Sequence, residues 1–250
     1  MNPEREFPLE TDIGDFAEIL RPVDVTELPL IVGGHAAGLW SRYFLSRGVA
    51  KLAEYLPFRS KDLDLVGTME LLENLHKRFK GRLLRSEPRS PVFGRLDIPQ
   101  SGGGVLRVEV LHTVLGLDAK DLKHTVDIEV AGIVARVPLP HLVLKAKLAN
   151  SALITQDGRQ DVKHARMMLV CVRAFIQELL ENHRAGLIGE RPVVNLLEEI
   201  REVMISRTGE KAATLWDFDF PEVWPMEELK TTGCEKVARW FEHRLSNVNY

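Results

Sequence analysis

Two kinds of hydrophobic pattern alternate over the first part of the chain. Short apolar runs at 28–32 and 63–66 have the length of buried strands, whereas residues 35–55 and 69–84 show the spacing of amphipathic helices. Strands that alternate with helices are typical of α/β and α+β proteins. The pattern therefore predicts a sheet with helices packed on it.

Further apolar runs predict antiparallel strands, the first two joined by a glycine-rich turn: 92–98, 105–114 and 126–137. Beyond Pro138 the spacing becomes helical over four stretches: 142–152, 161–181, 193–205 and 226–245. We therefore predict an α+β fold, in which a mixed-sheet domain over residues 1–139 precedes a helical domain over residues 140–250.

Two acidic residues flank one apolar residue in the second predicted strand. Side chains alternate faces along a strand, so Asp62 and Asp64 would project to one side while Leu63 and Leu65 face the core. Carboxylates held about 7 Å apart along a strand can share hard divalent cations, which prefer oxygen ligands. A half-exposed strand with solvated charges is the alternative.

A glycine pair, Gly33 and Gly34, follows the first apolar run, where a strand would give way to a helix. The free N–H groups and the dipole of a helix N-terminus bind anions such as phosphate. A tight turn without a ligand is the alternative, because glycine is common wherever the backbone turns sharply. Glycines and paired acids together suggest nucleotide chemistry.

A site for two metal ions normally needs a third carboxylate from a neighbouring strand. Our choice is Glu109, because the valines on either side of it can face the core and leave Glu109 on the opposite face. A surface acid paired with Arg107 is the alternative. Asp127 and Glu129 repeat the acid-apolar-acid pattern and are the rival ligands.

Composition excludes some classes of protein but does not identify a single one. The 250 residues are 45% hydrophobic and 28% charged, enough for a substantial core, and the net charge of −3 gives no overall attraction to nucleic acid. There are two cysteines, no apolar run long enough for a bilayer, and no leader-like pattern at residues 1–6. We expect no disulfide framework, no membrane span and a cytoplasmic location.

Residues 31–36 and 60–65 resemble the glycine-pair and paired-acid signature of the DNA polymerase β-type nucleotidyltransferase superfamily. Within it, the likeness is greatest to minimal bacterial nucleotidyltransferases, including the toxins of abortive-infection toxin–antitoxin systems. Residues 146–150 and 159–164 are similar to the Lys-Leu helix and the Arg/Asp-bearing helix that follow the catalytic sheet in this family.

The chain departs from the family pattern in three places. Residues 39–59 lengthen the interval between the glycines and the acids, which a longer helix would absorb. Many members carry Ser after the first glycine, where this chain has Gly34 and then His35. Without that hydroxyl, backbone N–H groups are left to contact a phosphate. His164 stands where the later helix often presents a second aspartate.

Basic residues in the second half are candidates for phosphate contacts. Arg159, Lys163 and Arg166 are spaced i, i+4 and i+7, so on a continuous helix they would form one stripe able to meet a triphosphate or RNA. A solvated helix face is the alternative. Lys145 and Lys147 lie on the next predicted helix upstream, and the resemblance favours Lys147 as the phosphate ligand.

Other polar and aromatic residues give weaker signals. The histidines show no HxxxH or CxxC spacing, which gives little support for a zinc site: His112, His124, His141, His164 and His183. Four aromatic residues cluster near the C-terminus, and packing of the tail explains them as well as partner recognition does: Trp216, Phe218, Phe220 and Trp224.

These features predict a metal-dependent nucleotidyltransferase that moves an NMP from an NTP to an acceptor hydroxyl and releases pyrophosphate. Asp62, Asp64 and Glu109 would hold two Mg²⁺ (or Mn²⁺) ions. The nucleotide-binding residues would be Gly33, Gly34, Ser60, Lys147 and Arg159. The acceptor could be RNA, a protein or a small molecule.

Two alternatives remain at the level of sequence. One is a non-catalytic module that binds a nucleotide or a partner on the same scaffold, favoured if Glu109 lies away from the paired aspartates. The other is a toxin whose important partner is an antitoxin protein.

Overall fold

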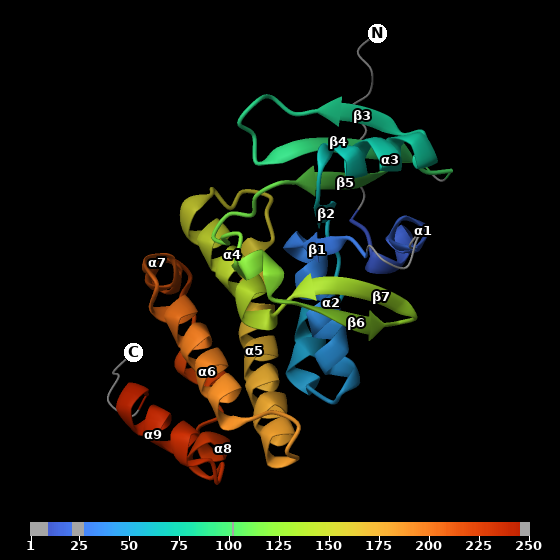
Figure 1. Ribbon diagram of the computed structural model, residues 1–250. Helices are drawn as coiled ribbons and strands as arrows, with labels where there is room; N and C mark the ends of the chain where they lie inside the picture. Colours follow the sequence, from blue (N-terminus) through green and yellow to red (C-terminus); the bar gives the residue numbers. More distant parts are fainter. Residues whose placement is uncertain (1–9, 22–27, 102, 246–250) are drawn as a thin grey trace.

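The computed structural model describes residues 10–21, 28–101 and 103–245, which form a mixed sheet with helices around it (Figure 1). Its seven strands are β1 (Leu30–Val32), β2 (Leu63–Val66), β3 (Arg82–Arg85), β4 (Val92–Pro99), β5 (Val105–Leu111), β6 (Thr125–Val130) and β7 (Ile133–Pro138). They lie in the order β3-β4-β5-β2-β1-β7-β6. A mixed sheet followed by helices confirms the predicted α+β class.

The sheet combines antiparallel pairs of consecutive strands, β1–β2, β3–β4, β4–β5 and β6–β7, with parallel pairs between strands that lie apart in the sequence. β4 and β5 pair antiparallel through the glycine-rich turn, as predicted. The run 126–137 is a second hairpin, because Ala131 and Gly132 adopt left-handed conformations (φ 52° and 77°) that suit a tight hairpin turn. β2 pairs parallel with β5, and β1 pairs parallel with β7, neighbours that the sequence pattern does not identify.

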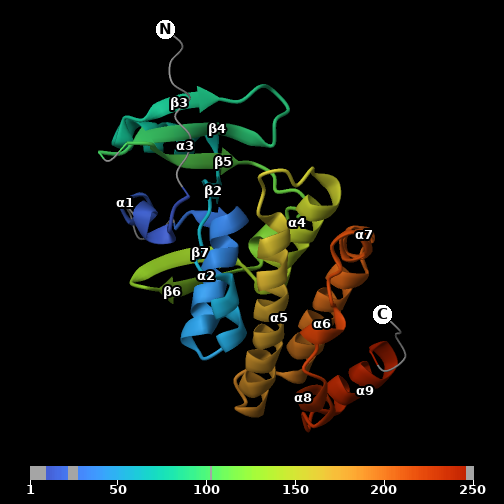
Figure 2. The same ribbon diagram turned by 180° about the vertical axis from the view of Figure 1, so that it is seen from behind.

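The helices pack mainly on one another beyond the centre of the sheet (Figures 1 and 2). They are α1 (Ala17–Leu20), α2 (Gly33–Ser46), α3 (Met69–Phe79), α4 (Pro140–Leu153), α5 (Asp161–Arg184), α6 (Glu190–Ile205), α7 (Arg207–Trp216), α8 (Met226–Lys230) and α9 (Glu235–Arg244). Helix α2 contacts β1 and β2, and α5 packs on both α2 and α4. Helices α8 and α9 lie at the opposite end from β3–β5, and α7 packs on α4.

Three of the predicted helices end earlier than expected, and a residue with positive φ lies at or shortly after each end. Helix α2 stops before Gly48 (φ 93°), and the rest of 35–55 is a 3₁₀ helix, Ala50–Tyr55. Helix α3 stops at Lys80 (φ 54°), so the end of 69–84 becomes β3. Gly233 (φ 70°) separates α8 from α9. A left-handed residue ends the helical hydrogen-bond pattern.

One hydrophobic cluster runs through the described residues from the sheet to the last helices. It includes Leu65 and Val108 of the sheet, Leu144 and Ile176 of α4 and α5, and Val237 of α9. The division into domains at 139/140 stays a prediction, but apolar packing continues across it.

The aromatic residues near the C-terminus serve packing. Phe218, Phe220 and Trp224 are buried, and the indole N–H of Trp216 donates to the carbonyl of Ser151 at 2.9 Å. Tail packing therefore accounts for this cluster.

Both cysteines are buried free thiols. Among the helices of the described ranges, none is long and apolar enough to cross a bilayer. Residues 1–6, where the sequence shows no leader-like pattern, lie outside the described ranges.

Candidate active site

Two adjacent parallel strands carry the acidic residues. Leu63 and Leu65 of β2 are fully buried, which turns Asp64 to the other face of the sheet, with Asp62 just ahead of the strand. β5 shows the same alternation, and its register places Glu109 directly beside Asp64. The strand pattern thus explains why these side chains meet.

The three carboxylates converge on one point. Asp62, Asp64 and Glu109 each offer an oxygen, and these oxygens all lie within 4.8 Å of one another. The alternative partner of Glu109, Arg107, instead makes a two-pronged ion pair with Asp97, at 2.8 and 3.2 Å. Glu109 therefore lies beside the paired aspartates.

The rival acids lie elsewhere. Asp127 and Glu129 are exposed on β6, at the far edge of the sheet from β5. The carboxylate of Asp127 accepts a hydrogen bond from Arg136 at 2.8 Å on the neighbouring strand. The idea that either is the third ligand is wrong, because two strands, β1 and β7, separate β6 from the strand of the aspartates, β2.

Burial and mutual repulsion change the electrostatics of the carboxylates. Burial among protein atoms is the main cause that raises the pKa of Asp64 well above its usual value, followed by the charges of Asp62 and Glu109. Burial and Asp62 likewise raise the pKa of Glu109. A cation placed between the three groups would remove this repulsion.

The glycine pair begins α2 beside these acids. Gly33 has φ 67°, and a Cβ atom on it would stand 1.8 Å from Oδ2 of Asp64. A Cβ atom on Gly34 would stand 2.4 Å from Oγ of Ser60, whose hydroxyl is 3.5 Å from Oδ1 of Asp62. Only glycine lets the helix start approach the carboxylates this closely. The preceding residue, Val32, makes no side-chain cap, so the first N–H groups of α2, at the edge of the cleft, have no capping partner from it.

A cleft of about 720 Å³ opens at this point between the sheet and the start of α5. Its lining brings together all of the predicted site residues: Gly33, Gly34, Ser60, Asp62, Asp64, Glu109, Lys147 and Arg159. The volume is in the range of small-molecule sites. The cleft has room for a nucleotide beside the carboxylates.

The cations of the cleft are held by protein groups. The ammonium of Lys147 donates to Asp161 at 2.9 Å, Arg159 donates to the same carboxylate at 2.6 Å, and Asn150 adds a third bond at 3.2 Å. Burial opposes ionisation of Asp161, but Lys147 and Arg159 outweigh it and lower its pKa to about 2. Asp161 is thus a charged anchor that the sequence reading did not single out as a site residue.

The predicted stripe of three cations does not form. Arg159 lies before the first residue of α5, so it is not on the same helix as Lys163 and Arg166. Lys163 donates to the carbonyl of Pro57 at 3.2 Å, and Arg166 donates to that of Trp216 at 3.0 Å.

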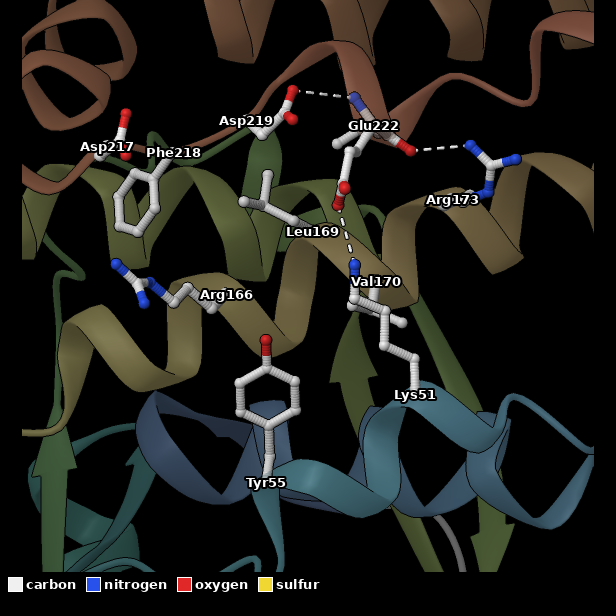
Figure 3. Close-up of a pocket in the computed structure, with 11 residues that line it drawn as sticks. Lys51, Tyr55, Arg166, Leu169, Val170, Arg173, Asp217, Phe218, Asp219 and Glu222 are labelled. Carbon is white, nitrogen blue, oxygen red and sulfur yellow. Dashed lines mark hydrogen bonds and ion pairs between the residues drawn. The ribbon is translucent and has the colours of Figure 1, made fainter.

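Arg166 instead borders a second, smaller hollow of about 220 Å³ (Figure 3). Beside it lies Phe218, and across the hollow Lys51 pairs with Glu222 at 2.8 Å. Arg173 donates to the carbonyl of Glu222 at 2.7 Å. These bonds tie the chain after α7 to α5 and to the 3₁₀ helix Ala50–Tyr55.

His164 also lines the cleft. In the family resemblance it counts only as a departure, because it stands where the later helix often has an aspartate. Its ring is buried against the position that a Cβ on Gly34 would take, at 3.0 Å. Within the described part of the chain its Nδ1 atom has no hydrogen-bond partner. Burial and then the charge of Lys147 hold its pKa well below the usual value, so it presents a neutral imidazole to the cleft.

Comparison with known proteins adds little. No protein-family model matches the chain, and no curated protein matches its sequence. One solved structure with a similar arrangement is an antigenic nucleotidyltransferase-like protein from Paracoccidioides brasiliensis. It is 18% identical, with a TM-score of 0.36 over 69% of this chain and 84% of that one. A likeness at this level carries no argument about the chain's activity.

Proposed function

We propose that the protein is a divalent-metal-dependent nucleotidyltransferase, which moves an NMP from an NTP to an acceptor hydroxyl and releases pyrophosphate. The observation that carries the proposal is the meeting of Asp62, Asp64 and Glu109, with oxygens within 4.8 Å of one another, in a cleft that also receives the glycine start of α2. An acidic trio beside a helix N-terminus suits a metal–triphosphate substrate.

The donor set fits a hard divalent ion. Three carboxylates from two strands offer only oxygen, which Mg²⁺ and Mn²⁺ prefer. Burial first, and then the neighbouring carboxylate charges, raise the pKa values of Asp64 and Glu109, a cost of ionisation that a bound cation would offset. Bound Mg²⁺ would supply charge neutralisation at the phosphates and acidity at the attacking hydroxyl.

Other groups of the chain contact the phosphates or balance their charge. The uncapped N–H groups of Gly33 and Gly34 bind phosphate oxygens, as the N-terminus of a helix does. Arg159 keeps 42% of its side-chain surface exposed, so it can reach a triphosphate while still bonded to Asp161. Lys147 is 6% exposed and acts from behind Asp161 as a fixed positive charge.

The experiment is label transfer from each NTP, labelled at the α-phosphate, in the presence of Mg²⁺ and total cellular RNA and protein. We expect label on one class of acceptor with the wild type. Asp64→Asn and Glu109→Gln should lower transfer by about 100-fold or more, since each removes one charge from a site that works by electrostatic stabilisation.

Asp127→Asn is the matched control, because it neutralises an aspartate of the same sheet outside the cleft. It should leave transfer unchanged. Metal-dependent NTP binding that is equal in the wild type and in the Asp62→Asn/Asp64→Asn double variant would refute the proposal. NTP binding lost in that variant, with no transfer by the wild type to any acceptor, would favour the non-catalytic module.

A further inference from the structure

A second set of metal-ligand side chains lies far from the cleft, where three C-terminal helices meet. His183 is in the last turn of α5, Glu190 is the first residue of α6, and Cys234 directly precedes α9. Each offers one ligand atom, and these atoms all lie within 4.8 Å of one another. Three chain segments thus deliver a nitrogen, an oxygen and a sulfur to one point.

The imidazole of His183 is oriented as a metal-binding histidine normally is. Its Nδ1 atom lies 2.9 Å from the carbonyl oxygen of Ile188, in the loop that leads to α6. A proton on Nδ1 donated to this carbonyl leaves Nε2 with its lone pair, the neutral form that binds a metal. The backbone bond is the second-shell contact that fixes such a tautomer.

Cys234 is a thiol whose pKa is raised by burial and by the Glu190 carboxylate, so a bound metal ion has to displace its proton. This cysteine is the N-cap residue of α9, so the positive end of that helix dipole lies at its side chain. The residue is only 2% exposed, and the other cysteine, Cys171, is remote on α5 beside Ser41. A buried thiol at a helix start, next to an imidazole and a carboxylate, has the chemistry of a ligand set.

An ion pair with a lysine side chain holds Glu190 beside His183 and Cys234. The ammonium of Lys236, in the first turn of α9, pairs with the Oε2 atom of Glu190 at 3.1 Å. This ion pair fixes the Glu190 side chain between α6 and α9. The other oxygen of the carboxylate remains available as a metal ligand.

We propose that His183, Glu190 and Cys234 form a zinc site that joins the end of α5 to the starts of α6 and α9. Nitrogen, oxygen and thiolate sulfur are the ligands that Zn²⁺ accepts, with water in the fourth position. Tetrahedral bonds of the usual lengths place donors about 3.5 Å apart, so small side-chain movements within the observed 4.8 Å close the site. The ion stabilises the packing of the C-terminal helices.

The test uses the full-length protein, reduced and freed of metal with a chelator. Titration with Co²⁺ should give the thiolate-to-metal charge-transfer band and the intense visible bands of tetrahedral cobalt, both abolished by one equivalent of Zn²⁺. Cys234→Ser should remove the charge-transfer band. His183→Gln and Glu190→Gln should each weaken Zn²⁺ binding by more than the roughly 10–100-fold that loss of a second-shell partner causes.

Two controls separate this site from other metal binding. Cys171→Ser removes the other buried thiol and should leave the cobalt spectrum unchanged. Asp62→Asn/Asp64→Asn should also leave it unchanged, which keeps the result independent of the proposed transferase site. Circular dichroism verifies that each variant is folded. A wild-type cobalt complex without a charge-transfer band, or one that Cys234→Ser retains, would overturn the proposal.

Discussion

At the scale of single residues, the site depends on glycines as much as on acids. Gly33→Ala should abolish metal-dependent nucleotide binding, because its Cβ would meet the Asp64 carboxylate at 1.8 Å. Gly48→Ala is the matched control, since Gly48 also has positive φ (93°) but no heavy atom within 4 Å of the added carbon. It should cost about 1–2 kcal/mol of stability and leave binding intact. Isothermal titration with Mg²⁺–NTP measures the difference.

A second residue-scale prediction concerns pH. Because the pKa of Asp64 is raised in the folded protein, its contribution to stability is present at low pH and is lost as the pH rises through the folded pKa. In chelator at pH 7, Asp64→Asn should therefore melt about 2–4 °C above the wild type, and the gap should shrink towards pH 4. Mg²⁺ should stabilise the wild type and reverse the order.

Thermal melts of Asp127→Asn provide the reference for that series. Asp127 is exposed and its pKa is lowered by the hydrogen bond from Arg136, so its loss should bring no gain in melting temperature at any pH. A gap for Asp64→Asn that is independent of pH would show that packing, and not charge repulsion, causes it.

At the scale of elements, the ion pair between α4 and the start of α5 forms one side of the cleft. Lys147→Met keeps the aliphatic stem but leaves Arg159 as the one remaining cation at Asp161, with Asn150 as its other hydrogen-bond partner. It should destabilise the protein by about 3 kcal/mol or more, because the buried charge loses its main partner. Urea unfolding measures this. Lys147→Met/Asp161→Asn should recover part of the loss.

The exposed pair of Arg136 and Asp127, at 2.8 Å, is the control for burial. Arg136→Met should cost less than about 1 kcal/mol, since water solvates both charges when they separate. Equal losses at the two pairs would contradict the view that Asp161 is an obligatory anchor of the cleft.

At the scale of the whole molecule, the continuous core predicts cooperative unfolding. Apolar packing joins the sheet, α4, α5 and α9 without a break at residue 139, so calorimetry should show a single transition with equal van't Hoff and calorimetric enthalpies. Two separated transitions would support independent domains at 1–139 and 140–250.

The same scale shows what a sequence can and cannot reveal. Alternation within a strand is local, so the placement of Asp62, Asp64 and Glu109 opposite their buried neighbours could be read from spacing alone. The parallel pairing that sets Glu109 beside Asp64 depends on which strands meet, which no local pattern contains. The bond of Lys147 to Asp161, and the early stops of α2 and α3, likewise depend on tertiary neighbours or on single left-handed residues.

The order of the strands in the sheet also decides when each strand can pair during synthesis. During synthesis β1 and β2 leave the ribosome early, but β2 cannot gain its parallel neighbour until Glu109 has emerged, and β1 waits longer still for β7. Until then their apolar edges are open to other chains, which is the condition in which nascent proteins aggregate or bind chaperones. Translation therefore has to pass residue 164 before all the residues that line the cleft exist, and a chain released earlier lacks part of that lining.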